Sequence, residues 1–279
     1  MKFFTEIFKN FSSNQSKCQC PHTISEDYCD SIARLLKLSN LNKNFNEKYA
    51  KETYISLTNF DEKNLLIKED NIKQINKDLK RTYPSYNFYK EENTLEKLKN
   101  ILKAFSNYER EIQYYQGMNF IVGFFLFHCE EYVSFWLFAS LMEDYDLRSM
   151  YIKGFPGLEK HTKRVEKILK EKYFELYRNF NILGVSVKII MIEWLYSLFS
   201  SLIPLELQIN FYNGFFSQGW NFFYKMCISM FLNLNGTFNE AADVYIALKF
   251  GKNDEEKKNE INENWEKIIK KAYEIEIDS

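Results

Sequence analysis

Turn-forming residues are scarce in this chain. Its 279 residues include only 9 glycines and 4 prolines, the residue types that most often interrupt regular elements and form turns. A chain with few turns has long elements, and in a chain of this size long elements are usually helices. Lys, Leu, Glu and Ile are abundant here and can build such helices. The sequence therefore predicts an all-α protein.

Apolar side chains recur at intervals of three and four residues, the spacing that places them on one face of a helix. One such stripe consists of Leu95, Leu98, Ile101, Leu102 and Phe105. A longer one consists of Val187, Ile190, Met191, Trp194, Leu195, Leu198, Phe199 and Leu202. Because Ile189, Ile192 and Tyr196 add apolar residues between its members, we expect this second helix to be buried on most sides. Pro204 is expected to end it and to start the next helix.

The composition indicates a chain with a large core and a net charge close to zero. Apolar residues make up 46% of the sequence and aromatic residues 18%, which is too much hydrophobic matter for a disordered chain. The 37 basic residues nearly balance the 38 acidic ones, so no basic field directs the protein towards DNA or RNA. We therefore expect no nucleic-acid partner.

Cysteine usage and hydropathy indicate a soluble protein of a reducing compartment. The five cysteines, at positions 18, 20, 29, 129 and 227, are an odd number and do not form a disulfide framework. Cys-Gln-Cys-Pro-His at 18–22 lacks a second ligand pair at zinc-finger spacing, which favours a flexible segment over 1–21 rather than a metal site. No uninterrupted apolar run approaches the ~20 residues that span a bilayer. We expect a cytoplasmic location.

The sequence contains no phosphate-binding loop of its own. Neither G-x-x-x-x-G-K-[ST] nor G-x-G-x-x-G occurs. The histidines His22, His128 and His161 lie in no recognisable nucleophile or zinc motif. If the chain takes part in catalysis, it does not do so with a standard hydrolase site.

Asp78 and Arg81 form the first of two short segments that could carry chemistry. Three residues apart on a predicted helix, they share a face, and the carboxylate can fix the guanidinium fork. Tyr83-Pro84 is expected to end this helix, which places Arg81 at a terminus facing a loop. Taken alone, the pair is more simply interpreted as an ordinary surface ion pair.

Gln116 and Gly117 form the second segment, just ahead of an apolar helix that begins near Met118. Glutamine offers an acceptor and two donors without charge, which suits a side chain that orients water beside a phosphate oxygen. Glycine permits a positive φ and close backbone approach. Taken alone, this segment is more simply a loop that caps the helix. Arginine and glutamine are, however, the two side chains that GTP hydrolysis uses most directly.

In this order, Ile-x-x-Asp-x-x-Arg and then Tyr-x-Gln-Gly-Met-Asn resemble the TBC domain of Rab GTPase-activating proteins. The matching residues are Ile75, Asp78 and Arg81 in the first catalytic motif and Tyr114, Gln116 and Gly117 in the second. Further similarities downstream are Trp194, Leu195, Phe199, Pro204 and Leu205, and then Phe215, Phe216 and Gly219. The resemblance covers roughly residues 24–250.

Two places depart from the family's pattern. The family's first motif, an arginine followed four residues later by a tryptophan, would fall on Cys29 and Ala33 in this chain. The Trp-Asp pair that the family usually carries further on is replaced here by Tyr212-Asn213. The departures leave open where the domain begins and whether activity survives at the divergent motif.

The resemblance implies a multi-helical fold of two closely packed subdomains. It implies a TBC domain over 22–250, with a catalytic N-terminal half over about 22–150 and a C-terminal half over about 151–250. The charged segment 251–279 carries one apolar stripe, Ile261, Trp265, Ile268, Ile269 and Ala272. We expect it to be a helix that packs on the domain, with a partner-binding helix as the alternative.

The resemblance also implies a GTPase-activating function exerted in trans on a GTP-bound Rab-family GTPase. Arg81 would neutralise charge on the transferring phosphoryl group and Gln116 would position the attacking water. Asp78 would orient Arg81, and Tyr114 would help to hold the second loop. GTP and magnesium would belong to the partner, so that this chain needs no cofactor, and membrane contact would be indirect, with recruitment to endomembranes left open.

Two alternatives remain at this point. One is a TBC-like scaffold or effector that binds a Rab without accelerating hydrolysis. The other is a helical interaction module unrelated to GTPases. The sequence does not indicate which Rab is the target.

Overall fold

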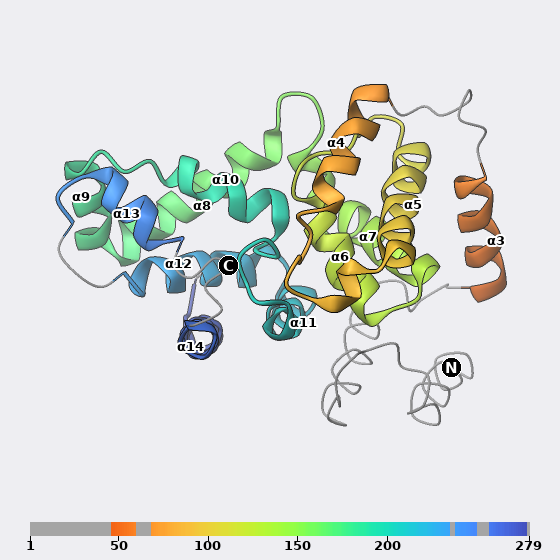
Figure 1. The fold of residues 1–279 in the computed structure, drawn as a ribbon. Helices are drawn as coiled ribbons and strands as arrows, with labels where there is room; N and C mark the ends of the chain where they lie inside the picture. The colour runs from red at the N-terminus through yellow and green to blue at the C-terminus, as the bar shows by residue number, and fades with distance from the viewer. Residues whose placement is uncertain (1–45, 60–67, 235–237, 250–256, 278–279) are drawn as a thin grey trace. The chain divides into compact units, whose positions relative to one another are not determined.

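The computed structural model describes residues 46–59, 68–234, 238–249 and 257–277. Every regular element in these ranges is a helix (Figure 1), which confirms the predicted all-α class. The chain divides into two compact units, residues 1–114 with 122–140 and residues 115–121 with 141–279. The domain limits proposed above stay predictions. The segment 1–21 and the divergent positions Cys29 and Ala33 lie outside the described residues.

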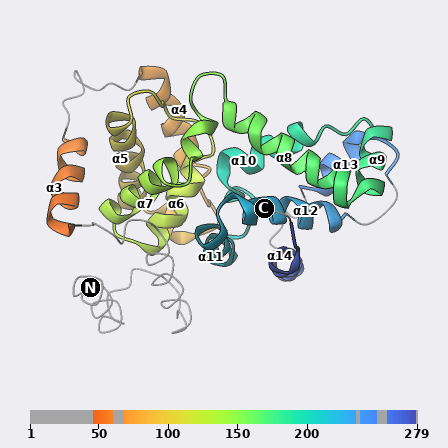
Figure 2. The same cartoon turned by 180° about the vertical axis from the view of Figure 1, so that it is seen from behind.

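The first unit is built around α5. Its elements are α3 (Glu47–Thr58), α4 (Glu69–Leu79), η3 (Asn87–Lys90), α5 (Glu92–Tyr108) and most of α6 (Met118–His128) and α7 (Glu131–Glu143). Both α3 and α4 pack against α5. Four residues of the predicted stripe on α5 are buried: Leu98, Ile101, Leu102 and Phe105. The Phe105 ring meets that of Phe138 on α7 with centroids 4.7 Å apart. Figure 2 shows α5 and α7 within this unit.

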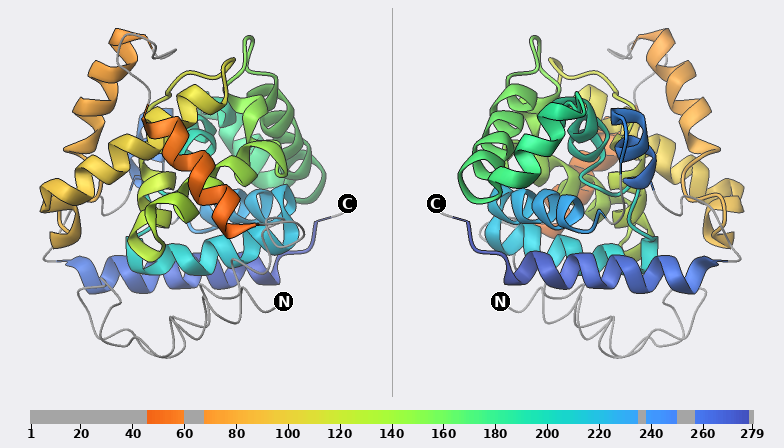
Figure 3. Two further views of the ribbon diagram at one scale, coloured as in Figure 1. Left: turned by 90° about the vertical axis from the view of Figure 1, so that its right-hand side faces the viewer. Right: turned by 90° about the vertical axis from the view of Figure 1, so that its left-hand side faces the viewer.

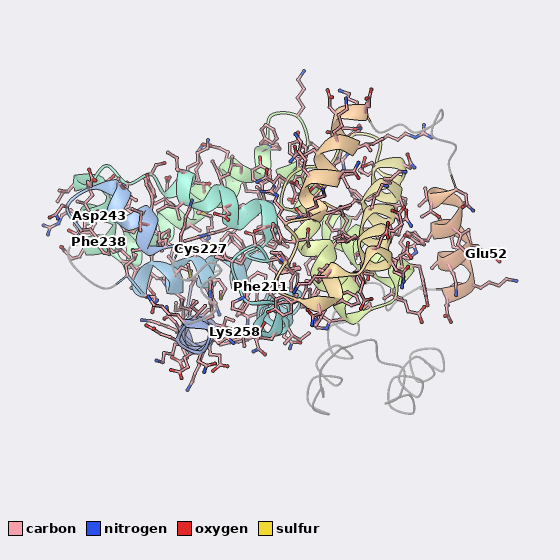
Figure 4. The ribbon with its side chains drawn as sticks, in the orientation of Figure 1. Glu52, Phe211, Cys227, Phe238, Asp243 and Lys258 are labelled. Carbon is pink, nitrogen blue, oxygen red and sulfur yellow. The ribbon has the colours of Figure 1, made fainter. Side chains whose placement is uncertain are left out.

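The second unit is built around α12 (Trp220–Leu232). Its further elements are η4 (Leu147–Met150), α8 (Pro156–Lys172), α9 (Phe174–Ile182), α10 (Val187–Ser197), η5 (Leu205–Leu207), α11 (Gln208–Gln218), α13 (Ala241–Ala247) and α14 (Lys258–Glu274). Helices α8, α11 and α14 all contact α12. Phe211 of α11 and Cys227 of α12, labelled in Figure 4, have no exposed surface and belong to this core.

The charged C-terminal segment forms the long helix α14 (Figure 3). Its stripe residues Trp265, Ile268, Ile269 and Ala272 are buried, and the carbonyl of Ile268 accepts a hydrogen bond of 2.7 Å from the Ser229 hydroxyl of α12. Its charged residues are all exposed, as expected of a helix with one apolar face.

Helix α10 differs from its prediction in two respects. It ends at Ser197, because Leu198 and Phe199 adopt left-handed φ values of 45° and 60°. The N–H of Phe199 bonds to the carbonyl of Trp194 at 3.0 Å, which closes the helix end. Pro204 therefore does not end this helix but precedes η5.

The expectation that α10 is buried on most sides is also wrong. Ile189 is 60% exposed and Ile192 is 40% exposed. The helix packs against α8 and buries the face that carries Val187, Ile190, Met191 and Trp194. Ile189 and Ile192 lie outside that face and stay exposed, because periodicity does not reveal how many neighbours a helix has.

Within the described ranges, no single helix is both long enough and apolar enough to cross a membrane. By length and composition alone, α9 and α10 pass the same test as a pair, with a bend of 110° between them.

Candidate functional site

Arg81 lies in a turn that directly follows α4. The helix ends at Leu79. A helical face shared by Asp78 and Arg81 would require it to continue for two more residues. The chain keeps turning beyond that point, since the N–H groups of Arg81 and Thr82 bond to the carbonyls of Asp78 and Leu79, both at 3.2 Å. Tyr83 then adopts a left-handed φ of 45° and leads away from the helix. Arg81 and Asp78 stay in contact because of this extra turn.

The Asp78 carboxylate is the centre of a buried hydrogen-bond network. Its side chain is 1% exposed. Oδ1 accepts from Arg81 Nε at 2.8 Å and from Gln74 Nε2 at 3.0 Å, and Oδ2 accepts from the Tyr114 hydroxyl at 2.6 Å. A buried carboxylate is costly unless it is paired and hydrogen-bonded. The network meets that requirement, so the pair is not the exposed ion pair that its spacing alone suggests.

The Arg81 guanidinium is anchored at one end and open at the other. Its side chain is 44% exposed. Within the part of the chain that the structure describes, its one hydrogen bond is the contact of Nε with Asp78. Both terminal nitrogens keep their donors, in the fork geometry that matches two oxygens of a phosphate or carboxylate. The arrangement can present a fixed cation to an anionic group.

Close packing surrounds this turn. Ile75 of the predicted motif is fully buried beneath it, and the Thr82 hydroxyl donates to the carbonyl of Asp78 at 2.8 Å. On α6, a side chain at Gly123 would place its Cβ 2.9 Å from the Tyr83 ring. The absence of a side chain there lets the turn approach α6 closely.

The second segment enters α6 through Gln116 and Gly117. Gln116 is exposed and lies immediately before the helix. Gly117 has a φ of 114°, which glycine adopts without strain. Its N–H donates to Oδ1 of Asn119 at 3.1 Å, and its carbonyl accepts from the N–H of Phe120 at 3.1 Å. The backbone on either side of Gln116 is therefore fixed.

This segment rests on the end of α10, within the second unit. A Cβ added to Gly117 would lie 2.6 Å from the carbonyl oxygen of Tyr196. The Tyr115 ring packs among three others, with centroid distances of 5.5 Å to Tyr151, 5.9 Å to Phe155 and 6.2 Å to Tyr196. Burial raises the pKa of Tyr151 well above its usual value, so its hydroxyl keeps the proton that it donates to the Tyr196 carbonyl at 2.9 Å.

The structure thus brings together Ile75, Asp78, Arg81 and Tyr114 in the first unit, whereas Gln116 and Gly117 belong to the second. The Tyr114 hydroxyl contacts Asp78, and so it supports the arginine segment rather than the glutamine segment. Sequence reasoning did not identify Gln74 as part of this network. It also treated Tyr196 only as an extra apolar residue, because its backbone carbonyl leaves no trace in the sequence.

Other candidate groups form no alternative site in the described part of the chain. No group of three or more His, Cys, Asp or Glu side chains there could hold a metal ion. Burial lowers the pKa of both His128 and His161 to about 3, so both are neutral at physiological pH. Tyr212, at one of the divergent positions, is a buried framework residue whose hydroxyl lies 2.8 Å from Ser200 Oγ.

Two solved structures share this fold. The Ypt/Rab-GAP domain of Gyp1p superimposes with a TM-score of 0.66 at 16% identity, over 87% of this chain and 86% of that one. A Chlamydomonas flagellar RabGAP TBC domain gives the same TM-score and identity over 98% of this chain and 92% of its own. The multi-helical TBC fold predicted from the sequence is confirmed.

Curated relatives agree with that fold. The Rab GTPase-activating protein eat-17 of Caenorhabditis elegans is 33% identical over 159 residues, and the human ecotropic viral integration site 5 protein homolog is 31% identical over 160. Each match takes in 57% of this chain but only 18% and 20% of those proteins. GYP5 of Eremothecium gossypii is 27% identical over 254 residues, 90% of this chain and 28% of its own. The Rab-GTPase-TBC domain matches residues 31–237, and the chain belongs to this family.

Proposed function

We propose that this chain accelerates GTP hydrolysis by a Rab-family small GTPase, to which it supplies Arg81 and Gln116 in trans. The observation that carries the proposal is the state of Arg81, whose Nε is held by a buried carboxylate while both terminal nitrogens stay open. A long flexible arginine is useful for transition-state charge only when it is held in this way.

Arg81 would neutralise charge that develops on the transferring phosphoryl group. Preorganised donors aimed at that charge need no rearrangement during the reaction, and an arginine finger is typically worth ~10³–10⁵ in rate. Asp78, held in turn by Tyr114, would supply the preorganisation. A relative of this chain, eat-17, is named as a Rab GTPase-activating protein, which supports the proposal.

Gln116 would orient the attacking water. Its uncharged amide can accept from the water and donate to a phosphate oxygen at the same time. Its exposure at the entry to α6 and the fixed backbone of Gly117 suit that task. GTP and magnesium would belong to the Rab in its GTP-bound state, since the sequence carries no phosphate-binding loop.

Single-turnover GTP hydrolysis by a panel of GTP-loaded Rabs tests the proposal. Arg81→Lys should lower the stimulated rate by about 10³-fold or more, because lysine keeps the charge but loses the fork. Gln116→Ala should lower it by about 10²-fold. Arg178→Lys is the matched control, since Arg178 forms an exposed i,i+3 ion pair with Glu175 on α9 and should leave the rate unchanged.

Two outcomes would decide against the proposal. If Arg81→Lys and Gln116→Ala both matched the wild type on a responsive Rab, the two fingers would be wrongly assigned. If the wild type bound a GTP-loaded Rab tightly without changing its rate, the chain would be a Rab-binding scaffold.

A further inference from the structure

Among the described residues, Gln74 is the one side-chain amide that bonds to Asp78. It lies one turn before Asp78 on α4, and its Nε2 donates to Oδ1 at 3.0 Å. The same oxygen accepts from Arg81 Nε at 2.8 Å. The Tyr114 hydroxyl holds the other oxygen at 2.6 Å. Arg81 thus shares this carboxylate with two uncharged donors that come from two different segments.

The sharing determines how Arg81 is held. An arginine and a free carboxylate favour two parallel hydrogen bonds, one to each oxygen, and such a fork uses a terminal nitrogen as well as a second donor. Here Oδ2 is occupied by Tyr114 and one side of Oδ1 by Gln74. What is left for Arg81 is the single contact through Nε. Both terminal nitrogens therefore stay available.

The residue type at position 74 fits this task. The amide of glutamine donates to the carboxylate without adding charge. A lysine here would compete with Arg81 for Asp78, and a glutamate would compete with Asp78 for Arg81. Glutamine supports the carboxylate and leaves the ion pair intact.

We propose that Gln74 is a positioning residue for the arginine finger. Gln74 takes the second acceptor direction of Asp78 Oδ1 while Tyr114 holds Oδ2, so that Arg81 keeps one side-chain hydrogen bond, through Nε. Both terminal nitrogens then stay free for two oxygens of the phosphoryl group. The inference rests on the proposed GTPase-activating function and adds to it a residue that acts on Arg81 through their shared partner, Asp78.

Gln74→Met is the first test, because methionine has a similar length and helix propensity but no donor. The substitution frees one acceptor direction of Asp78 Oδ1, which can then accept a terminal nitrogen of Arg81. In single-turnover hydrolysis by a responsive Rab, the rate at saturating protein should fall about tenfold, while the half-saturating concentration stays the same. Asn76→Met is the matched control, since Asn76 is exposed on the same helix and does not face Gln74, and it should leave both values unchanged.

A second pair of variants separates positioning from a structural role. Gln74→Glu keeps the shape and helix propensity but replaces the donor with a second carboxylate, so it should lower the rate more than Gln74→Met does. In an Arg81→Lys background, Gln74→Met should cause no further loss, because the fork that it protects is already absent. A role in packing alone would lower the rate by the same factor in both backgrounds.

The outcomes are distinguishable from those that test the function itself. If Gln74→Met and Gln74→Glu both kept the wild-type rate while Arg81→Lys abolished it, Gln74 would not position the finger, and the proposed function would stand. If Arg81→Lys also kept the wild-type rate, the function and this inference would fall together.

Discussion

The segments that carry Arg81 and Gln116 are held by different physical means. Arg81 is held at its side-chain head, by a hydrogen bond to a carboxylate that is 1% exposed. Gln116 is held through its backbone, by the close contact of Gly117 with the Tyr196 carbonyl and by the rings around Tyr115. One segment depends on polar partners and the other on shape.

The difference follows from the two side chains. Arginine has a long flexible side chain, so fixing its backbone alone would leave the guanidinium in many positions. Glutamine is shorter, so a fixed backbone already confines its amide to a small region. A polar network tolerates the loss of a partner poorly, whereas a close-packed contact tolerates added volume poorly. Substitutions chosen for each weakness should therefore separate the two segments.

Among substitutions of the residues that support Arg81 and Gln116, Gly117→Ala should have the largest effect. The new Cβ would lie 2.6 Å from the Tyr196 carbonyl oxygen, at a φ of 114°. The strain should lower the free energy of unfolding by about 1–3 kcal/mol. The stimulated hydrolysis rate should fall about 10²-fold, since a displacement of about 1 Å has that cost when geometry controls the reaction.

Gly184→Ala is the control for this prediction. Gly184 has a φ of 67° in the same unit, but a Cβ there meets nothing within 4 Å. Urea unfolding should detect strain in both variants, and only Gly117→Ala should slow hydrolysis. Equal rates for the two would mean that the contact with Tyr196 does not position Gln116.

Tyr114→Phe should have the second largest effect. It removes the hydroxyl that donates to Asp78 at 2.6 Å, and a hydrogen bond to a charged group is worth about 1.5–3 kcal/mol. The freed Oδ2 can then accept a second donor from Arg81, so the stimulated rate should fall about tenfold, equivalent to about 1.4 kcal/mol in the barrier.

Tyr54→Phe serves as its control. Tyr54 donates to the Glu131 carboxylate at 2.7 Å in the same unit. Both variants should lower the urea midpoint, and only Tyr114→Phe should lower the hydrolysis rate. A rate loss shared by both would indicate general loosening of the unit rather than release of Arg81.

The Asp78–Arg81 pair also shows which features of the site can be predicted from the sequence. The spacing of Asp78 and Arg81 correctly predicts their contact, but Glu175 and Arg178 have the same spacing and form a pair in which both side chains are mostly exposed. What distinguishes the first pair is burial under Tyr114, a residue 36 positions away in sequence. Spacing along a helix reports local neighbours and carries no information on that long-range partner.

In the fold, too, local features can be predicted from the sequence and others cannot. The helical class is predictable from the scarcity of glycine and proline, and the stripe on α5 from its local periodicity. The helix that begins at Met118 is predictable from its run of apolar residues. The early end of α10 is not predictable, since Leu198 and Phe199 continue the apolar pattern and are buried, yet adopt a left-handed backbone conformation. Most residues of the stripe on α10 are both helical and buried, whereas Leu198 and Phe199 at its end are buried but not helical.

Substitutions at Tyr115 should have the smallest effects and test the packing segment through its ring. Tyr115→Leu removes the aromatic contacts with Tyr151, Phe155 and Tyr196, each of which is worth about 0.5–1.5 kcal/mol in favourable geometry. Partial repacking should limit the loss of unfolding free energy to about 1 kcal/mol and the loss of hydrolysis rate to about fivefold. A loss as large as that of Gly117→Ala would mean that the ring, rather than the backbone contact, positions Gln116.

Tyr115→Phe then makes the contrast with Tyr114 as direct as the chain permits. The two tyrosines are neighbours, but Tyr114 uses its hydroxyl, whereas the Tyr115 hydroxyl has no hydrogen bond among the described residues. Tyr115→Phe keeps the ring, so unfolding free energy should stay within about 0.5 kcal/mol of the wild type, and the hydrolysis rate should not change. The same one-atom deletion should therefore slow hydrolysis at position 114 and leave it unchanged at position 115. Equal losses at both would show that the glutamine segment also depends on a polar contact, and the distinction between the two modes of support would be lost.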